Sequence, residues 1–425
     1  MMKPQVKIMH YTAPPIIGGV ENVIAQHSRL LVEAGYPVTW VVGRGESDPG
    51  LDGVKVVIFP ELDSQHPTNL AIARAFALGV IPKDFARVQS EIARALTAIL
   101  RRTDVVIVHN VFNFHFNLPF TSALHDLIDH HVVRQMIAWC HDISRFVNPA
   151  SGEALRVGFP WDLLRTFRPT VTYVAVSQHR QSALAQVLGC PAQKIQVIPN
   201  GVHLSMLLGL AETSSHLIEE FALLDGNPIM LMPIRITRAK NIEFAIRVTG
   251  ALKAQGLKPK LVVTGPPDPH SPKIDQYVDE LLTLRQDLEL SKEVVFVHEG
   301  TSRMPRSLMI GAEIVAELYR LTDLVFLPSH REGFGLGVLE AGLIGKPIFC
   351  TSMPALAQVG ENLVHRIDLT DSPKQVAGRI QSWMQQDRVC QLSQHVRQHL
   401  TWSAIFAQTI EPLVQQTINA PEFAS

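Results

Sequence analysis

The sequence predicts an α/β protein made of two doubly wound domains, and three observations support that prediction. Short apolar runs rich in β-branched residues alternate with segments of helical periodicity along nearly the whole chain, as in parallel sheets covered by helices on both faces. The chain has 425 residues, which is too long for one ordinary hydrophobic core. The turn Pro199-Asn200-Gly201 separates the strand patterns into two sets.

The first set of patterns predicts one open α/β sheet. Residues 6–10 form its first strand, the loop 14–19 follows, and a helix with apolar residues at helical spacing ends at Gly35. The other strands of this sheet are expected at residues 38–42, 55–59, 105–109, 135–140, 172–176 and 196–198. Helices are expected between most of them.

The second set predicts another sheet of the same kind. Its strands are expected at residues 229–233, 260–264, 294–297, 324–328, 347–351 and, more weakly, 363–367. The helices between them are expected to include residues 242–252, 274–284, 312–319 and 338–344. We therefore divide the chain into an N-terminal domain (1–205), a C-terminal domain (206–400) and a last segment (401–425). The helix of that segment, at about 402–417, is expected to pack back toward the N-terminal domain.

The composition is that of a soluble globular protein. Apolar residues make up 46% of the chain and charged residues 18%, and the formal net charge is −1. Nothing in this balance indicates nucleic acid as a partner. A local basic group, Arg94, Arg101 and Arg102 at a helix end, could contact anionic lipid or an acidic acceptor, although arginines there also suit the helix dipole as a solvated face.

Cysteine usage and hydropathy favour a cytoplasmic protein. Cys140, Cys190, Cys350 and Cys390 are far apart and form no CxxC pair, as expected for thiols in a reducing compartment. The first residues have no apolar signal core, and no apolar stretch reaches the length of a spanning helix. We expect a cytoplasmic location.

The strongest local motif is residues 330–342, which directly follow an expected strand. Three alternate glycines, Gly333, Gly335 and Gly337, lie at a helix N-terminus, where free N–H groups favour a phosphate or a sugar oxygen. Glu332 in the loop and Glu340 one turn into the helix offer carboxylate oxygens to a vicinal diol. The alternative is a turn with solvated carboxylates. A dinucleotide fingerprint is disfavoured, because Glu340 stands where the third glycine belongs.

A basic loop, residues 235–241, follows the first strand of the second domain. Arg235 and Lys240 in it could neutralise a diphosphate leaving group, since breaking a bond to a nucleotide leaves negative charge to stabilise. An ordinary solvated basic loop is the alternative. Its position at a strand's carboxyl end favours the ligand interpretation.

The first domain has its own candidates at strand ends. Gly18 and Gly19 open a helix and could bind an anion through backbone N–H groups, or could form a simple turn. His141-Asp142 and His109-Asn110 each follow a strand. Histidines such as His125, His130 and His131 invite a metal interpretation, but the sequence has no HExxH or Cys/His set, and we expect no metal.

These motifs together resemble the GT-B retaining glycosyltransferases of family 4 over nearly the whole chain. They occur in the family's order: Gly18–Glu21, His141-Asp142, 176–178, 197–202, Arg235 with Lys240, and Glu332 with Glu340. The resemblance implies two doubly wound Rossmann-like domains that face a central cleft. It also implies transfer of a hexosyl group from a UDP- or GDP-linked sugar to a hydroxyl acceptor, such as a glycan, lipid or small polar molecule.

The family's residue roles carry over by position. The resemblance implies that Glu332 binds hydroxyls of the donor sugar, that the backbone of residues 333–336 (Gly333, Phe334, Gly335, Leu336) meets the sugar or the phosphates, and that Glu340 holds the ribose. Arg235 and Lys240 would grip the diphosphate, so that neither a metal nor another cofactor is needed. His141 would lie beside the transferring sugar, and Gly18 and Gly19 would face the phosphates.

Two positions depart from the family pattern. His203 stands where an aspartate is common and Ile234 where a glycine is common, and we expect little effect of His203 on chemistry. Residues 115–131 match no family motif and are expected to help define the acceptor pocket.

The expected mechanism is front-face substitution. A double displacement needs two carboxylates about 5 Å apart, and the obvious pair is already assigned to donor binding. Three alternatives stay open: a sugar-nucleotide epimerase, a non-catalytic nucleotide-sugar-binding protein, and a pyridoxal-dependent phosphorylase, for whose cofactor lysine the sequence has no signal. The sequence does not specify the donor sugar, its base or the acceptor.

Overall fold

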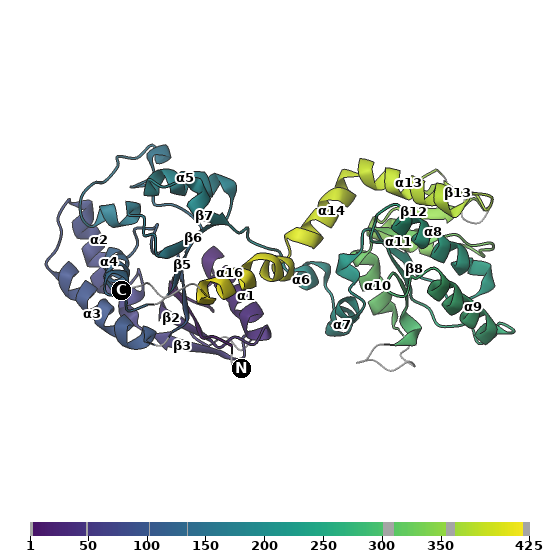
Figure 1. Ribbon diagram of the computed structural model, residues 1–425, viewed down its shortest axis with the longest axis horizontal. Coiled ribbons are helices and arrows are strands. Elements are labelled where there is room, and N and C mark those ends of the chain that lie inside the picture. The colour runs from purple at the N-terminus through teal and green to yellow at the C-terminus, as the bar shows by residue number, and fades with distance from the viewer. Residues whose placement is uncertain are drawn as a thin grey trace. The chain divides into compact units, whose positions relative to one another are not determined.

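The computed structural model describes residues 3–47, 50–101, 103–133, 135–300, 310–353 and 362–419 (Figure 1). The chain divides into two compact units. The N-terminal unit comprises Met1–Gly201 together with Trp402–Ser425, and the C-terminal unit comprises Val202–Thr401. The division thus falls four residues before the expected boundary at 205, and the last segment belongs to the N-terminal unit.

The N-terminal unit is built on a seven-stranded sheet in the order β3-β2-β1-β4-β5-β6-β7, and every neighbouring pair is parallel. Its strands are β1 (Val6–Thr12), β2 (Val38–Arg44), β3 (Val54–Ile58), β4 (Val105–His109), β5 (Met136–Cys140), β6 (Val171–Ala175) and β7 (Ile195–Val197). The helices of this part of the chain are α1 (Gly19–Glu33), α2 (Pro67–Ala77), α3 (Asp84–Leu100), α4 (Leu118–Asp129) and α5 (Gln178–Leu188).

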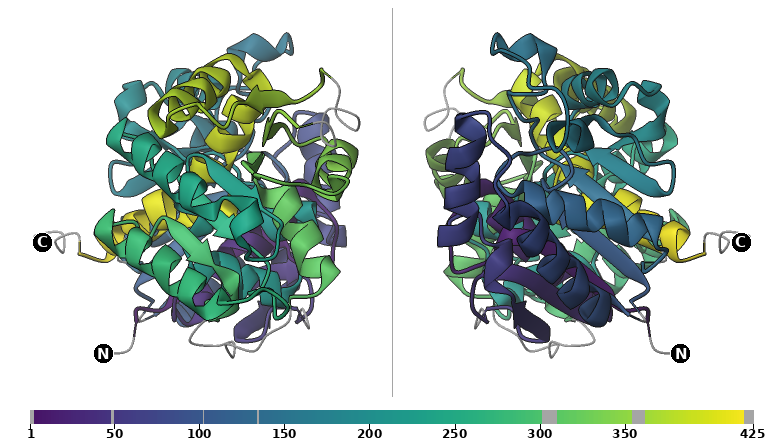
Figure 2. Two further views of the ribbon diagram at one scale, coloured as in Figure 1. Left: turned by 90° about the vertical axis from the view of Figure 1, so that its right-hand side faces the viewer. Right: turned by 90° about the vertical axis from the view of Figure 1, so that its left-hand side faces the viewer.

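Both faces of this sheet are covered, which explains why its strands are continuous apolar runs. Alternate residues of one strand point to opposite faces, so Ile8 of β1 packs in one apolar cluster and Met9 in another. The cluster of Met9 includes apolar residues of α3, α4 and α5. In Figure 1 and the right-hand view of Figure 2, the blue helices α3 and α4 lie against the strands of this unit.

The opposite face is covered by α1 and by the last segment of the chain. That segment is α15 (Trp402–Ile405), a π-helical turn (Phe406–Ile410) and α16 (Glu411–Asn419). Its buried residues Ile405, Ile410 and Val414 pack in the same cluster as Ile8. The segment therefore completes the core of the N-terminal unit, although the C-terminal unit precedes it in sequence.

The C-terminal unit contains a six-stranded parallel sheet in the order β10-β9-β8-β11-β12-β13. The strands are β8 (Ile229–Met232), β9 (Lys260–Val263), β10 (Val294–Phe296), β11 (Leu324–Leu327), β12 (Ile348–Thr351) and β13 (His365–Ile367). The helices are α6 (Leu204–Leu208), α7 (Glu212–Glu220), α8 (Ile242–Ala254), α9 (Ile274–Asp287), α10 (Ala312–Leu321), α11 (Leu336–Ile344), α13 (Pro373–Gln386) and α14 (Arg388–His399). One apolar cluster joins sheet and helices.

The predicted fold class is confirmed: the chain forms two doubly wound α/β units, and each predicted strand is present. The strand order reverses between β1 and β4 in the first sheet and between β8 and β11 in the second. Ligands of doubly wound sheets bind outside the carboxyl ends of the strands at such a reversal. These two places are where a site is expected. None of the helices in the described ranges is long and apolar enough to span a bilayer.

Candidate active site

The basic loop and the glycine-rich loop of the C-terminal unit follow neighbouring strands. The basic loop follows β8 and the glycine-rich loop follows β11, and these two strands pair directly at the reversal of strand order. The loops also touch, because the backbone N–H of His330 donates to the carbonyl of Ala239 at 2.8 Å. The fold thus brings two motifs that are about ninety residues apart in sequence to one edge of the sheet.

Lys240 and Glu332 form an ion pair at this edge. Lys240 Nζ donates to both carboxylate oxygens of Glu332, at 2.7 and 2.6 Å. The side chains retain 20% and 13% of their exposure, so the pair is reachable but poorly hydrated. In such surroundings a charge interacts more strongly with a ligand than it would in bulk water.

The residues beside the pair are fixed by hydrogen bonds. Asn241, which has a positive φ of 52°, donates from Nδ2 to the carbonyl of Pro328 at 3.0 Å. The hydroxyl of the buried Ser329 lies 3.4 Å from Glu332 Oε1. The backbone carbonyl of Ser329 accepts a hydrogen bond from Thr351 Oγ1 at 2.7 Å. The ends of β8, β11 and β12 are therefore connected around Glu332.

The glycine-rich loop opens helix α11, as the sequence predicts. Gly335 precedes the helix with a φ of +90°, a conformation that a residue with a Cβ adopts only under strain. A Cβ added at Gly333 would meet nothing within 4 Å, so space lies beside that residue. Phe334 and Leu336 are 56% and 63% exposed. The backbone here is open to a ligand that approaches the helix N-terminus.

Glu340 is held by a residue that the sequence analysis missed. The hydroxyl of Tyr319 donates to Glu340 Oε2 at 2.7 Å. Tyr319 lies on α10 and is 2% exposed; its burial, and then its bond to Glu340, raise the pKa of the phenol. The carboxylate is thereby fixed through one oxygen. Nothing in the sequence marks Tyr319 except its place on the buried face of an expected helix.

Arg235 does not contact this ion pair and makes a longer contact of its own. It lies 3.9 Å from Asp268, and its side chain is 65% exposed. The structure thus brings Lys240 and Glu332 into direct contact, places Glu340 on the helix that the glycine-rich loop opens, and leaves the guanidinium of Arg235 largely in solvent.

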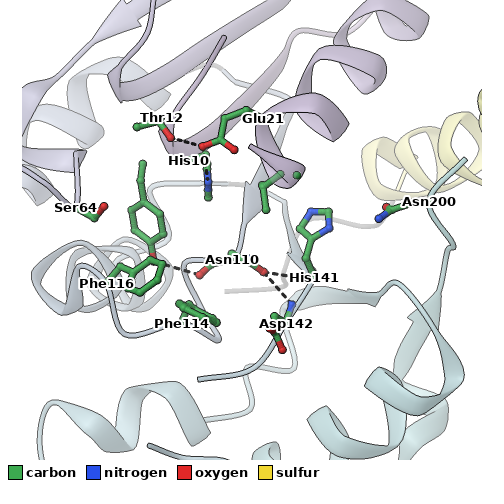
Figure 3. A pocket seen from close by; sticks show the side chains of 13 residues that line it. His10, Thr12, Glu21, Ser64, Asn110, Phe114, Phe116, His141, Asp142 and Asn200 are labelled. Atoms are coloured by element: carbon green, nitrogen blue, oxygen red, sulfur yellow. Dashed lines mark hydrogen bonds and ion pairs between the residues drawn. The ribbon is translucent and has the colours of Figure 1, made fainter. Parts of the chain in front are cut away.

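The N-terminal unit has a pocket at its own reversal of strand order. The pocket has a volume of about 470 Å³ and lies at the carboxyl ends of β1, β4 and β5 and the N-terminus of α1. His10, Glu21, Asn110, His141 and Asp142 are among its polar lining residues (Figure 3). Its size falls within the range of about 300–1,000 Å³ that is usual for small-molecule sites.

Asn110 fixes the position of His141. With a φ of 55°, Asn110 adopts the left-handed conformation that asparagine tolerates well. Its Oδ1 accepts from the backbone N–H of His141 at 2.8 Å, and its carbonyl accepts from the Tyr11 hydroxyl at 3.2 Å (Figure 3). The position of Asn110 at a strand end is evident from the sequence, but its role is not, because its contacts depend on strand pairing.

The histidines around this pocket are neutral at physiological pH. Burial, and then the neighbouring imidazole of His10, lower the pKa of His141 to about 3. Burial also lowers the pKa of His109 well below its usual value, and that of His10. His109 Nδ1 lies 2.9 Å from His141 Nε2, so one ring nitrogen of His141 is already engaged. A neutral imidazole here can exchange hydrogen bonds with a ligand without bringing a charge.

The two glycines of the first loop have different positions. Gly18 precedes α1 in an extended conformation, and a Cβ there would meet the carboxylate of Glu21. Gly19 is the first residue of α1 and lines the pocket, and a Cβ there would meet nothing within 4 Å. Glu21, which accepts from Thr12 Oγ1, also lines the pocket, although it was predicted only as part of a motif.

Residues 115–131 contribute to the pocket through one residue. Phe116 lines it and is 49% exposed, next to Phe114 from the same loop. The other residues include α4, most of whose side chains are buried in the core. Within the described ranges, no group of three or more histidine, cysteine, aspartate or glutamate side chains is arranged to hold a metal ion.

Comparisons with known proteins match both units. The family model described as Glycosyltransferase Family 4 matches residues 17–206, and the model described as Glycosyl transferases group 1 matches residues 215–399. Mannosylglucosylglycerate synthase of Thermotoga maritima is 24% identical over 368 residues, which cover 81% of this chain and 79% of that protein.

Other relatives match over shorter stretches. A D-inositol 3-phosphate glycosyltransferase of Nocardia farcinica is 26% identical over 186 residues, which cover 43% of this chain and 38% of that protein. The chain likewise spans 45% of an uncharacterized glycosyltransferase of Methanocaldococcus jannaschii. A solved glycosyltransferase structure from Rickettsia africae ESF-5 aligns over 98% of this chain and 100% of that one, at 14% identity and a TM-score of 0.38.

The family models and the architecture agree. Each model matches most of one of the two α/β units, and the matched ranges include the glycine-rich loop after β11, the basic loop after β8 and those lining residues of the N-terminal pocket that follow β1. The chain belongs to the glycosyltransferases of family 4, and its two doubly wound units are the two domains of the GT-B fold.

Proposed function

We propose that this chain transfers a hexosyl group from a UDP- or GDP-linked sugar to a hydroxyl acceptor, with retention of configuration and without a metal ion. The observation that carries the proposal is the ion pair of Lys240 and Glu332 at the carboxyl ends of β8 and β11. It stands beside the open helix N-terminus of α11. A cation, a carboxylate and free backbone N–H groups match the phosphate and hydroxyl groups of a nucleotide sugar.

In the donor complex, Lys240 exchanges part of its contact with Glu332 for the diphosphate, and Glu332 accepts hydrogen bonds from sugar hydroxyls. Arg235, whose side chain is mostly exposed, is free to turn toward the same diphosphate. Glu340, held by Tyr319, accepts from the ribose diol. His141 meets the primary hydroxyl of the sugar, and Gly18 and Gly19 offer backbone N–H groups to the phosphates. These roles follow the family's motif positions.

The proposed chemistry is a substitution on one face of the sugar. The acceptor oxygen bonds to the anomeric carbon on the side from which the diphosphate leaves. The departing diphosphate oxygen takes the proton of the acceptor hydroxyl, so no protein base is required. Lys240, Arg235 and the helix N-terminus stabilise the charge that develops on the leaving group. A double displacement would need a free nucleophilic carboxylate, whereas Glu332 is paired with Lys240 and Glu340 is bonded to Tyr319.

The acceptor is proposed to enter the pocket of the N-terminal unit. That pocket contains His141, the residue assigned to the transferring sugar, and has room for a sugar-sized molecule. The name of one group of relatives includes D-inositol 3-phosphate, which makes a polyol a reasonable first acceptor to test.

The place of action is proposed to be the cytoplasm, in keeping with four free cysteines, three of which are buried. A peripheral membrane contact stays a further prediction. Arg94 is exposed within α3 and Arg101 is exposed directly after its last residue, while Arg102 lies outside the described residues. Sedimentation with anionic vesicles would test this contact.

The test of the proposed function uses three donors: UDP-glucose, UDP-N-acetylglucosamine and GDP-mannose. One of them should raise the unfolding temperature and be hydrolysed slowly in the presence of EDTA, and an acceptor should accelerate release of the nucleoside diphosphate. NMR of the product should show the anomeric configuration of the donor. An epimerase would instead interconvert donor sugars without releasing a diphosphate, and a binding protein would be stabilised without turnover.

A further inference from the structure

The side chains that line the N-terminal pocket do not suit an anionic ligand. Among its lining residues, all of them in the described part of the chain, two are carboxylates, Glu21 and Asp142, and none is lysine or arginine. The two lining histidines, His10 and His141, are held neutral by burial. The lining side chains therefore carry negative charge and accept hydrogen bonds, and the part of the lining that suits a phosphate is the N-terminus of α1 at Gly19, which is assigned above to the donor diphosphate.

Arg44 and Arg180 lie beside lining residues, and both are already paired with carboxylates: Arg44 neighbours Thr12 in the sheet and lies 3.1 Å from Asp63. Arg180 Nη2 lies 3.2 Å from Asp142 Oδ1, and the same oxygen accepts from the backbone N–H of Ile143 at 2.8 Å. The Asp142 side chain is still 53% exposed, so its other oxygen can accept from a ligand. A phosphate in the pocket would have to compete with Asp142 for Arg180. It would also approach the carboxylate of Glu21, and the two negative charges would repel each other.

The remaining part of the wall is aromatic. The rings of Phe114 and Phe116 meet edge to face with centroids 4.5 Å apart, and Phe116 lies 6.0 Å from the ring of Tyr11. Figure 3 shows the two phenylalanines together on one side of the pocket and Thr12 and Glu21 on the other. Phe116 keeps 49% of its exposure, so one side of a large apolar ring is uncovered.

A ring with an apolar face and hydroxyl groups along its edge fits both walls. We propose that the acceptor is a neutral cyclic polyol, a sugar or cyclitol without phosphate or carboxylate, whose ring lies against Phe116 and whose hydroxyls donate to Glu21 and Asp142. This inference rests on the proposed glycosyl transfer and names the substrate class that the pocket selects. It assigns Phe116 as the residue that determines acceptor affinity.

The experiment compares matched pairs of acceptors: glucose with glucose 6-phosphate, and myo-inositol with myo-inositol 1-phosphate. Acceptor-dependent release of the nucleoside diphosphate is measured with the donor that the protein consumes. Binding of each compound to the protein alone is measured by saturation-transfer NMR. The variants are Phe116→Ala, Arg180→Gln and, as a matched control, Phe159→Ala, a phenylalanine of the same unit that is 54% exposed and does not line the pocket.

The proposal predicts that the neutral member of a pair has a kcat/KM at least about tenfold above that of its phosphorylated partner. Phe116→Ala should raise the acceptor KM about tenfold and leave the donor KM unchanged, while Phe159→Ala changes neither. Thermal unfolding of the variants checks that they fold.

Preference for the phosphorylated member, its loss in Arg180→Gln, or an unchanged acceptor KM in Phe116→Ala would overturn the proposal. Absence of binding by either class in the NMR experiment would do so too. If no donor is consumed but neutral polyols still bind and Phe116→Ala weakens them, the transferase function fails while the ligand class of the pocket stands.

Discussion

Single residues decide how the charges of the candidate site are arranged before a ligand binds. Glu332 and Glu340 are both carboxylates near one helix, but Glu332 is paired with Lys240 and Glu340 with a neutral phenol. A carboxylate balanced by a cation and one held by a hydroxyl are suited to different ligand groups. This difference supports the assignment of Glu332 to the reacting sugar and Glu340 to the ribose, which does not react.

Tyr319→Phe should raise the donor KM severalfold and leave kcat nearly unchanged. The substitution removes the hydrogen bond that fixes Glu340, and ribose contacts are made equally in the ground and transition states. Initial rates against donor concentration give both constants. Tyr277→Phe is the matched control, since the buried Tyr277 donates to Glu243 in the same unit. An equal fall of kcat and kcat/KM in Tyr319→Phe would contradict the assignment.

His27→Phe should make the stability of the N-terminal unit less sensitive to acid. Burial, and then the neighbouring imidazole of His141, lower the pKa of His27 to about 3, and neither ring nitrogen has a partner among the described residues. Below pH 6.5, the pKa of histidine in the unfolded chain, His27 binds a proton in the unfolded state but not in the folded state. The stability present above pH 6.5 is therefore lost as the pH falls toward 3, by up to about 1.4 kcal/mol per pH unit and histidine.

Urea unfolding at several pH values between 4 and 7 measures this slope. Tryptophan fluorescence reports mainly the N-terminal unit, which contains Trp40, Trp139, Trp161 and Trp402. The phenylalanine variant should show a slope smaller by about one proton and, at pH 7, equal or higher stability. The exposed His130→Phe serves as control. Parallel pH curves for His27→Phe and the unmodified chain would be inconsistent with a buried neutral His27.

At the scale of elements, the helix N-terminus of α11 is the part of the donor site that the backbone supplies. Its loop contains two glycines with different constraints: Gly335 needs its positive φ, whereas Gly333 needs only the space beside it. The second kind of glycine allows a test that separates ligand approach from folding, because a Cβ there would contact the ligand and not the protein.

Gly333→Ala should leave the unfolding temperature nearly unchanged and raise the donor KM about tenfold, since the added methyl group keeps sugar or phosphate oxygens away from the loop. Gly342→Ala is the control, because Gly342 lies in α11, the helix that this loop opens, and a Cβ there also meets nothing within 4 Å. Thermal unfolding measures the unfolding temperature, and initial rates against donor concentration give the donor KM. An unchanged donor KM in Gly333→Ala would place the donor away from this loop.

Elements were more predictable from the sequence than the contacts between them. Buried parallel strands are short apolar runs, so β8 and β11 could be located closely from pattern alone. The ion pair of Lys240 and Glu332 depends on the pairing of those strands, and the local pattern of apolar residues does not predict strand order. For the same reason, the motifs indicated Glu340 whereas its partner Tyr319 was missed.

In the molecule as a whole, the N-terminal unit is built from two segments of the chain that the C-terminal unit separates in sequence. The chain leaves the N-terminal unit at Gly201 and returns to it at Trp402. The close approach of these residues leaves no room for a side chain at Gly201, where a Cβ would lie 2.7 Å from Trp402 N. Lys3 Nζ donates to Glu411 Oε1 at 2.8 Å and joins the first and last described parts of the chain.

A chain that ends at Thr401 should lose the cooperative unfolding of its N-terminal unit. The deletion exposes core positions that Ile405, Phe406, Ile410, Leu413 and Val414 cover, each 7% exposed or less. At about 1.5–3 kcal/mol per buried side chain, the loss approaches the usual stability of a domain, about 5–15 kcal/mol. Tryptophan fluorescence during urea unfolding measures it. Glu411→Gln, which removes one partly exposed ion pair, should shift the transition far less. An unchanged transition in the truncated chain would contradict the assigned unit.

We propose that the Lys240–Glu332 pair binds the nucleotide sugar where the glycosidic bond breaks. The measurement that tests it most directly is kcat/KM for acceptor-dependent release of the nucleoside diphosphate by Lys240→Met and Glu332→Gln. Lys253→Met, which removes a lysine paired with Glu293 in the same unit, is the control. We expect kcat/KM to fall at least about 100-fold in each of the first two variants and to stay near normal in the control. Near-normal rates in both Lys240→Met and Glu332→Gln would contradict it.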